Sequence, residues 1–164
     1  MSRQNPTVII ALGGNAISPK NESGNIEKQF EHTRESLNAM MHFVKERYNI
    51  CITHGNGPQV GAELLKNEIT KDTIPSLPLG VLVANTQGAI GYMIQQTLQN
   101  ALQKKDVDRE VVTFISQVIV DKNDPTIKNP TKFIGKSYSK EEAFKLSREF
   151  NWSIKEQESG ICLL

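Results

Sequence analysis

Short runs of consecutive apolar residues alternate along this chain with segments in which apolar residues recur every three or four positions. Residues 8–12 and 50–53 are such runs, and a glycine follows each within two residues, which predicts two strands buried on both faces of a parallel sheet. Residues 111–120 are apolar and rich in β-branched side chains, which predicts another strand. Strands and helices that alternate in this way predict an α/β layer architecture with right-handed crossovers.

Apolar residues at helical spacing predict the helices between these strands. Residues 30–48 and 89–102 each carry one apolar stripe, and the second stripe belongs either to the core or to a subunit interface. Pro58 favours a helix start, because the first helical position needs no N–H donor. Gly88 and Gly91 flank the second stripe at a cost of ~1 kcal/mol each relative to Ala, which indicates close approach of a backbone or a ligand.

The last third of the chain has a different texture. Residues 121–138 contain Pro, Gly and many polar groups, which predicts a loop or a small excursion from the sheet. Ser139 and Glu142 have the spacing of a capping box, which predicts a short helix after them. Trp152 and Ile154 alternate with polar residues and predict a last strand.

Composition narrows the class of protein. The chain has 164 residues, a formal charge of +1 and 23% charged residues, which suits a folded domain and argues against nucleic acid as the main partner. No apolar run approaches the ~18 residues of a membrane span. The 2 cysteines lie far apart, so a disulfide framework is not expected. We therefore expect a cytoplasmic protein with neither a membrane nor a nucleic-acid partner.

Two glycine-rich turns follow the first two predicted strands and form the candidate ligand site. Glycines at strand ends let backbone N–H groups approach a ligand, and a helix starting at Pro58 would add the positive end of its dipole, so the pattern indicates a phosphate or carboxylate site. The alternative is that each turn is only a tight connection. His54, inside the second turn, could contact a ligand or hold loop carbonyls. The candidate residues are Gly13, Gly14, Asn15, Gly55, Asn56 and Gly57.

Other phosphate, dinucleotide and metal signatures are missing from the sequence. The spacing of Gly55, Gly57 and Gly61 departs by one residue from the dinucleotide fingerprint, and no P-loop sequence occurs. Neither H-E-x-x-H nor paired C-x-x-C occurs. The sequence therefore predicts neither a P-loop nor a structural zinc site, and it gives only weak support for a dinucleotide site.

Five segments together resemble the carbamate kinases, a branch of the amino acid kinase family. They are VIIALGGNAI (8–17), THGNGPQVG (53–61), QGAIGYM (87–93), QVIVDKNDP (117–125) and NPTK (129–132). The resemblance implies a three-layer α/β/α sandwich with a mainly parallel sheet, an amino acid kinase-like N-terminal lobe and a small protruding subdomain. We expect a carbamoyl-phosphate-side lobe at 1–120, the protruding subdomain at 121–156 and a divergent tail at 157–164.

The same resemblance implies an activity. Carbamate kinases are phosphotransferases that convert ATP and carbamate reversibly to ADP and carbamoyl phosphate, usually in arginine breakdown by the deiminase route. The resemblance places the six turn residues around the transferring phosphoryl group and brings Lys132 toward it as a catalytic residue. ATP or ADP, Mg²⁺ and a homodimer are expected for the full-length family.

The chain also departs from the family pattern. Family members are about twice as long, and the lobe that holds the nucleotide would follow near the end of this chain. The resemblance therefore implies that this chain contains no cofactor site and no metal site. Gly80, Phe133 and Lys136 replace residues that the family pattern leads us to expect. We therefore expect a truncated form with little or no turnover alone. The alternatives are a non-catalytic module that binds carbamoyl phosphate or dimerises, and a non-Rossmann nucleotide-binding fold.

Overall fold

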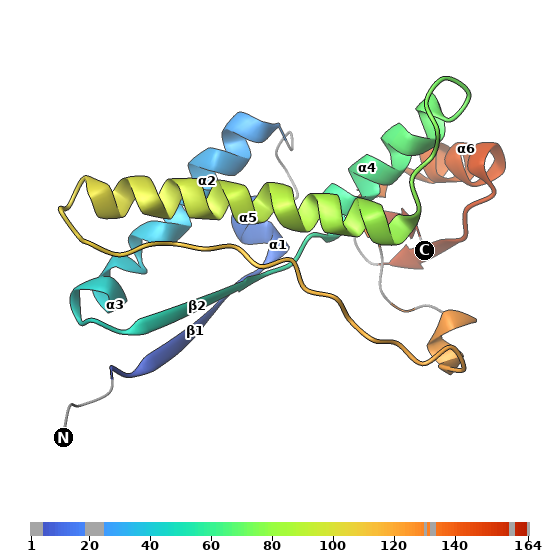
Figure 1. Cartoon of the computed structure of the whole chain (residues 1–164). Helices are drawn as coiled ribbons and strands as arrows, with labels where there is room; N and C mark the ends of the chain where they lie inside the picture. Colours follow the sequence, from blue (N-terminus) through green and yellow to red (C-terminus); the bar gives the residue numbers. More distant parts are fainter. Residues whose placement is uncertain (1–4, 19–24, 130, 132–133, 158–159, 164) are drawn as a thin grey trace. The chain divides into compact units, whose positions relative to one another are not determined.

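The chain folds into two compact units, seen here in a computed structural model that describes residues 5–18, 25–129, 131, 134–157 and 160–163 (Figure 1). The first unit comprises Met1–Gly55 and Gly88–Phe114, and the second comprises Asn56–Gln87 and Ile115–Leu164. Helix α5 (Leu79–Gln103) begins in the second unit and continues into the first.

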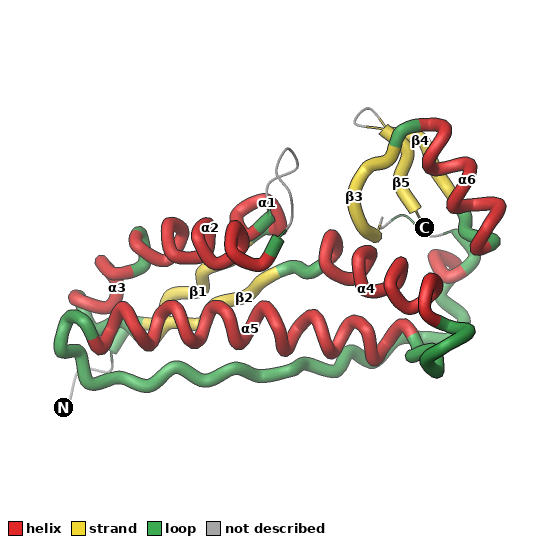
Figure 2. The backbone as a smooth tube through the Cα atoms, turned by 90° about the horizontal axis from the view of Figure 1, so that it is seen from above, coloured by secondary structure: helices red, strands yellow, loops and turns green. Residues whose placement is uncertain are grey.

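A parallel pair of strands, with helices packed against it, makes up the first unit (Figure 2). Its elements are β1 (Thr7–Leu12), α1 (Gly14–Ile17), α2 (Ile26–Asn38), α3 (Met41–Lys45), β2 (Asn49–His54) and the later part of α5. The register places Leu12 opposite His54, so the two strands end side by side. The predicted parallel α/β arrangement is confirmed. The long helix expected over 30–48 is divided into α2 and α3 by a turn at Ala39 and Met40.

Helices cover one face of β1 and β2. Leu12 is buried, and the inward side chains Ile10, Ile50 and Ile52 pack on the core formed by α1, α2, α3 and α5. Outward residues of the same strands are exposed, and Ile9 has 71% of its surface accessible. The prediction that both faces of these strands are buried is therefore wrong, because no described element of this unit covers the outer face. The stripe of α5, including Met93 and Ile94, is core.

Residues 111–120 do not form the predicted strand. Their backbone is extended, but within the described part of the chain it pairs with no other strand. Side chains of α5 bind it instead. In the first unit the Gln99 amide donates to the carbonyl of Arg109 and accepts from the N–H of Val111; in the second, Gln87 accepts from the N–H of Ser116. β-Branched residues favour extended backbone, but a β-strand also needs a neighbouring strand with which its backbone forms hydrogen bonds.

Gly91 permits the close packing of α5 on this extended segment. A Cβ at Gly91 would collide with Cγ2 of Thr113, and the Thr113 hydroxyl donates to the Gly91 carbonyl at 3.1 Å. The sequence predicted close approach of a backbone or a ligand at this glycine. Close approach is confirmed, but the approaching group is a side chain of the same unit.

The second unit joins several helices to a small antiparallel sheet. Its elements are α4 (Gly57–Thr70), the start of α5, η1 (Pro125–Ile127), β3 (Ile134–Tyr138), α6 (Lys140–Phe150), β4 (Ile154–Gln157) and β5 (Gly160–Leu163). The strand order is β3-β5-β4. The capping box of α6 is confirmed, since Ser139 and Glu142 each accept a hydrogen bond from the other's backbone N–H. The last predicted strand is β4, whereas β3 lies in the region expected to be a loop.

Candidate functional site

The first glycine turn lies at the carboxyl end of β1. Gly13 has φ −65° and ψ 157°, an extended conformation that ends the strand and leads into α1. Within this turn, the N–H of Ala16 donates to the Gly13 carbonyl at 2.9 Å. Gly14 and Asn15 are the first residues of α1, and the first N–H groups of a helix have no partner within that helix. A Cβ at Gly13 would meet no atom within 4 Å, so space is open beside the turn.

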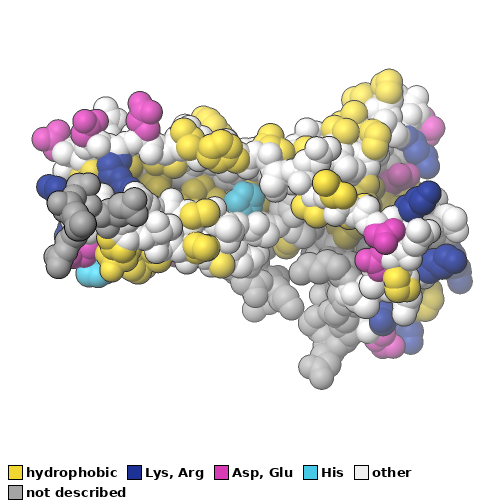
Figure 3. Space-filling view, turned by 60° about the horizontal axis from the view of Figure 1, so that its bottom comes forward, with side chains coloured by type: hydrophobic (Ala, Val, Ile, Leu, Met, Phe, Trp, Pro, Cys, Tyr) yellow, Lys and Arg dark blue, Asp and Glu magenta, His cyan; other side chains and the backbone are white. Residues whose placement is uncertain are grey.

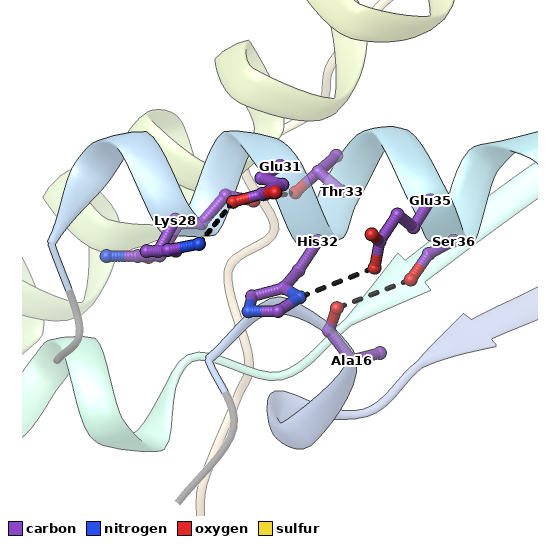
Figure 4. Close-up of polar contacts among 8 residues, drawn as sticks. Ala16, Lys28, Glu31, His32, Thr33, Glu35 and Ser36 are labelled. Atoms are coloured by element: carbon purple, nitrogen blue, oxygen red, sulfur yellow. Dashed lines mark hydrogen bonds and ion pairs between the residues drawn. The ribbon is translucent and has the colours of Figure 1, made fainter. Parts of the chain in front are cut away.

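Helix α2 supports the short helix that follows this turn (Figure 4). The Ser36 hydroxyl donates to the carbonyl of Ala16 at 3.3 Å, and Ile17 is completely buried below it. His32, on the same face of α2, has a side chain only 18% exposed and lies 3.6 Å from the Glu35 carboxylate. Backbone and packing contacts therefore hold the first turn against α2.

The second glycine turn begins beside the first, at the carboxyl end of β2. The N–H of Gly55 donates to the carbonyl of Leu12 at 3.3 Å, which extends the β1–β2 ladder by one bond. This N–H group is thus engaged inside the unit, whereas the space where a Cβ would stand on Gly55 is open. His54 Nδ1 lies 3.4 Å from the Gly55 carbonyl, so the imidazole contacts its own loop.

Asn56 and Gly57 follow in the chain and start α4 in the second unit. Asn56 is the N-cap residue of α4, but its side chain makes no capping bond to the helix. Its amide nitrogen instead donates to Oγ1 of Thr86, at 2.9 Å, and to the carbonyl of Val83, at 3.4 Å. Sequence reasoning missed Thr86, since a threonine within an apolar helical stripe gives no local signal of such a role.

Two other predicted positions give less information. Lys132 lies outside the described residues. Asn15 is described by its backbone alone, which belongs to α1.

Among the described residues, the titratable groups and the hollow on α6 indicate no second site. Within the described ranges, no group of three or more His, Cys, Asp and Glu side chains is close enough together to hold a metal ion. An open hollow on α6 is lined by Glu141, Phe144, Lys145, Arg148 and Glu149, and it contains none of the predicted site residues. In the same ranges, no helix is both long enough and apolar enough to cross a membrane.

Carbamate kinases are among the known proteins with sequences similar to this chain. A carbamate kinase from Pyrococcus furiosus is 46% identical over 151 residues, which are 91% of this chain and 48% of that protein. One from Clostridium perfringens is 40% identical over 152 residues, with the same shares. Over nine-tenths of its own length, this chain is similar in sequence to carbamate kinases. No protein-family profile matches it.

Solved structures agree with this assignment. A carbamate kinase from Giardia lamblia bound to citric acid superimposes with a TM-score of 0.91 at 34% identity, covering 97% of this chain and 52% of that one. The same enzyme bound to AMP-PNP gives a TM-score of 0.78. The fold is therefore that of the amino acid kinases, as the sequence motifs predicted. The chain spans about half the length of the carbamate kinases that it matches.

Proposed function

We propose that this chain provides the carbamoyl-phosphate side of a carbamate kinase, a phosphotransferase acting between ATP and carbamate. Identity of 40–46% to carbamate kinases over nine-tenths of the chain is the observation that carries the proposal. The two glycine turns support it, because they follow parallel strands that end side by side. Ligands of open α/β sheets bind at such strand ends.

The glycine turns would position the phosphoryl group. In the transfer, the bond from phosphorus to the carbamate oxygen breaks as a bond to the terminal phosphate oxygen of ADP forms. This step needs positioning and charge neutralisation rather than a covalent helper. Backbone N–H groups of Gly14 and Asn15 would serve the phosphate, and the open space at Gly13 and Gly55 would admit it. Asn56 and Gly57 are included in this candidate site on the family resemblance alone.

Lys132 remains part of this proposal on the family resemblance alone. It would neutralise charge on the phosphoryl group from a protruding subdomain at 121–156, next to a lobe at 1–120 and a tail at 157–164. Its ammonium group would act as a point charge on the phosphate oxygens.

ATP or ADP would bind to the half of a carbamate kinase that has no counterpart in this chain. The AMP-PNP complex of the Giardia enzyme supports a nucleotide partner. Mg²⁺ accompanies phosphoryl transfer of this kind, but the described residues offer no cluster of ligands that fits it, so we assign no step to it here. A homodimer, a cytoplasmic location and a place in arginine breakdown are proposed on the same resemblance.

The purified chain allows a direct test. We expect calorimetry to detect carbamoyl phosphate binding, and we expect ATP formation from ADP and carbamoyl phosphate to be far below that of a carbamate kinase twice as long. Gly13→Ala places a methyl group in the open space of the turn without backbone strain, so it should weaken binding and leave the melting temperature unchanged.

Gly80→Ala is the matched control, because it adds a methyl group in open space on α5, outside both turns. Equal binding by the wild type, Gly13→Ala and Gly80→Ala would contradict the assignment of the turn. A wild-type chain that neither binds carbamoyl phosphate nor makes ATP would contradict the function itself. Binding without any turnover, even with nucleotide and Mg²⁺ present, would favour the non-catalytic module.

A further inference from the structure

A hydrogen-bond network joins the second glycine turn to α5 within the second unit. The Thr86 hydroxyl accepts from Asn56 at 2.9 Å and donates to the carbonyl of Val83 at 2.8 Å. The second N–H of the Asn56 amide reaches the same carbonyl at 3.4 Å. Thr86 is only 3% exposed, so its hydroxyl has little access to water as an alternative partner. The three groups therefore fix the rotamer of Asn56.

This rotamer is unusual for the residue's position. Asparagine is among the strongest N-cap residues, and its side-chain oxygen ordinarily accepts from an N–H in the first turn of its helix. Asn56 holds the N-cap position of α4 without such a bond. Its backbone serves the helix normally, since its carbonyl accepts from the N–H of Val60 at 2.9 Å. The bond to Thr86 draws the side chain away from the start of α4.

We propose that Thr86 is a positioning residue for the substrate-binding turn. By holding the Asn56 amide against α5, it sets the backbone of Gly55–Gly57 and leaves the start of α4 without a side-chain cap. Without the hydroxyl, the Asn56 side chain is free to rotate and cap α4 itself. The N–H groups offered to an anion then change. The effect on the ligand rests on the function proposed above, whereas the effect on Asn56 does not.

Two substitutions separate the hydroxyl from the shape of the side chain. Thr86→Val keeps the branched shape and removes the hydroxyl, and Thr86→Ser keeps the hydroxyl. Thr97→Val is the control, because it removes a buried threonine hydroxyl from the same helix eleven residues further on, about 16 Å along its axis.

Nuclear magnetic resonance decides the positioning role without any ligand. We expect the Asn56 side-chain amide protons to exchange slowly in the wild type, Thr86→Ser and Thr97→Val, and at least tenfold faster in Thr86→Val. The backbone amide shifts of Gly55 and Gly57 should change in Thr86→Val alone. Unchanged exchange and shifts in Thr86→Val would overturn the proposal, whatever the ligand does.

Binding then measures the consequence. With carbamoyl phosphate as the probe, Thr86→Val should raise the dissociation constant about tenfold and Thr86→Ser should restore it. In an Asn56→Ala background, Thr86→Val should add no further loss, because Thr86 acts through Asn56. Equal binding by the wild type and Thr86→Val would overturn the role in binding. A wild type that does not bind would refute the proposed function, and the exchange experiment would still decide whether Thr86 orients Asn56.

Discussion

The Asp124 carboxylate, in the turn that leads into η1, accepts two hydrogen bonds from a single residue. The Thr126 hydroxyl donates at 2.6 Å and the Thr126 N–H donates at 2.8 Å, both to Oδ1. The hydroxyl bond first, and the backbone bond second, hold the pKa of Asp124 below its ordinary value. Both bonds favour the ionised carboxylate. Their contribution to folding stability is therefore present above the ordinary pKa of the group and is lost as pH falls through its lowered pKa.

Thr126→Val removes the stronger of these two donors. We expect the pKa of Asp124 to rise toward its ordinary value, while the remaining backbone bond keeps it somewhat below. Titration of the Asp124 carboxyl carbon by nuclear magnetic resonance measures the change. Thr126→Ser retains a hydroxyl and should retain the lowered pKa. If the pKa is the same in Thr126→Val as in the wild type, the hydroxyl is not its cause.

At the scale of elements, the features predicted correctly from the sequence are those with local signals. Pro58 lies at the start of α4 as expected, and Ser139 and Glu142 form the capping box of α6. The start of α5 was placed ten residues too late, because exposed apolar residues such as Leu79 obscure the helical stripe. Residues 111–120 were assigned to a strand because local propensity does not reveal whether a partner strand is present.

In the candidate site too, the features with a local sequence signal were predicted and those that depend on distant segments were not. The glycine turns were recognised because glycine after an apolar run is a signal within the sequence. The use of the Gly55 N–H in the strand ladder, and the bond between Asn56 and Thr86, depend on segments 43 and 30 residues apart. Such pairings arise only once the elements pack, so composition and spacing could not predict them.

The packing of α4 on β3 depends on a glycine at the contact. A Cβ at Gly61 would collide with the backbone of Gly135, which has φ +83° and cannot move as a flexible side chain would. Gly61→Ala should therefore destabilise the second unit by about 1–3 kcal/mol through overpacking. The higher helix propensity of alanine offsets ~1 kcal/mol of this loss. Chemical denaturation measures the difference in unfolding free energy.

Gly80→Ala provides the comparison for this change. It makes the same substitution within a helix, but its new methyl group meets no atom within 4 Å. We expect it to leave stability unchanged or to raise it by up to ~1 kcal/mol. Loss of stability in both variants would show that alanine is unfavourable in these helices for a reason other than the contact with Gly135.

At the scale of the whole molecule, the extended segment at residues 111–120 exposes an unusual amount of apolar surface. Figure 3 shows hydrophobic side chains exposed at several places on the face that it brings forward. Ile119 is 97% exposed. The large exposed side chains of the segment are Val112, Phe114, Ile115, Val118, Ile119 and Val120. Four of these side chains, from Ile115 onward, belong to the second unit. Exposed apolar side chains on an unpaired extended segment promote association, so we expect this chain to self-associate in solution.

A charge placed within the segment tests this expectation. Ile119→Lys should shift the chain toward monomer in light scattering after size exclusion, because burying an ammonium group in an apolar contact is costly. Ile69→Lys is the control, since Ile69 is also well exposed but lies on α4, outside the segment. If both variants dissociate the chain equally, a general increase in charge accounts for the effect. If Ile119→Lys leaves the association unchanged, the contact is made elsewhere and residues 111–120 are not its cause. Dissociation by Ile119→Lys alone would assign the association to this segment.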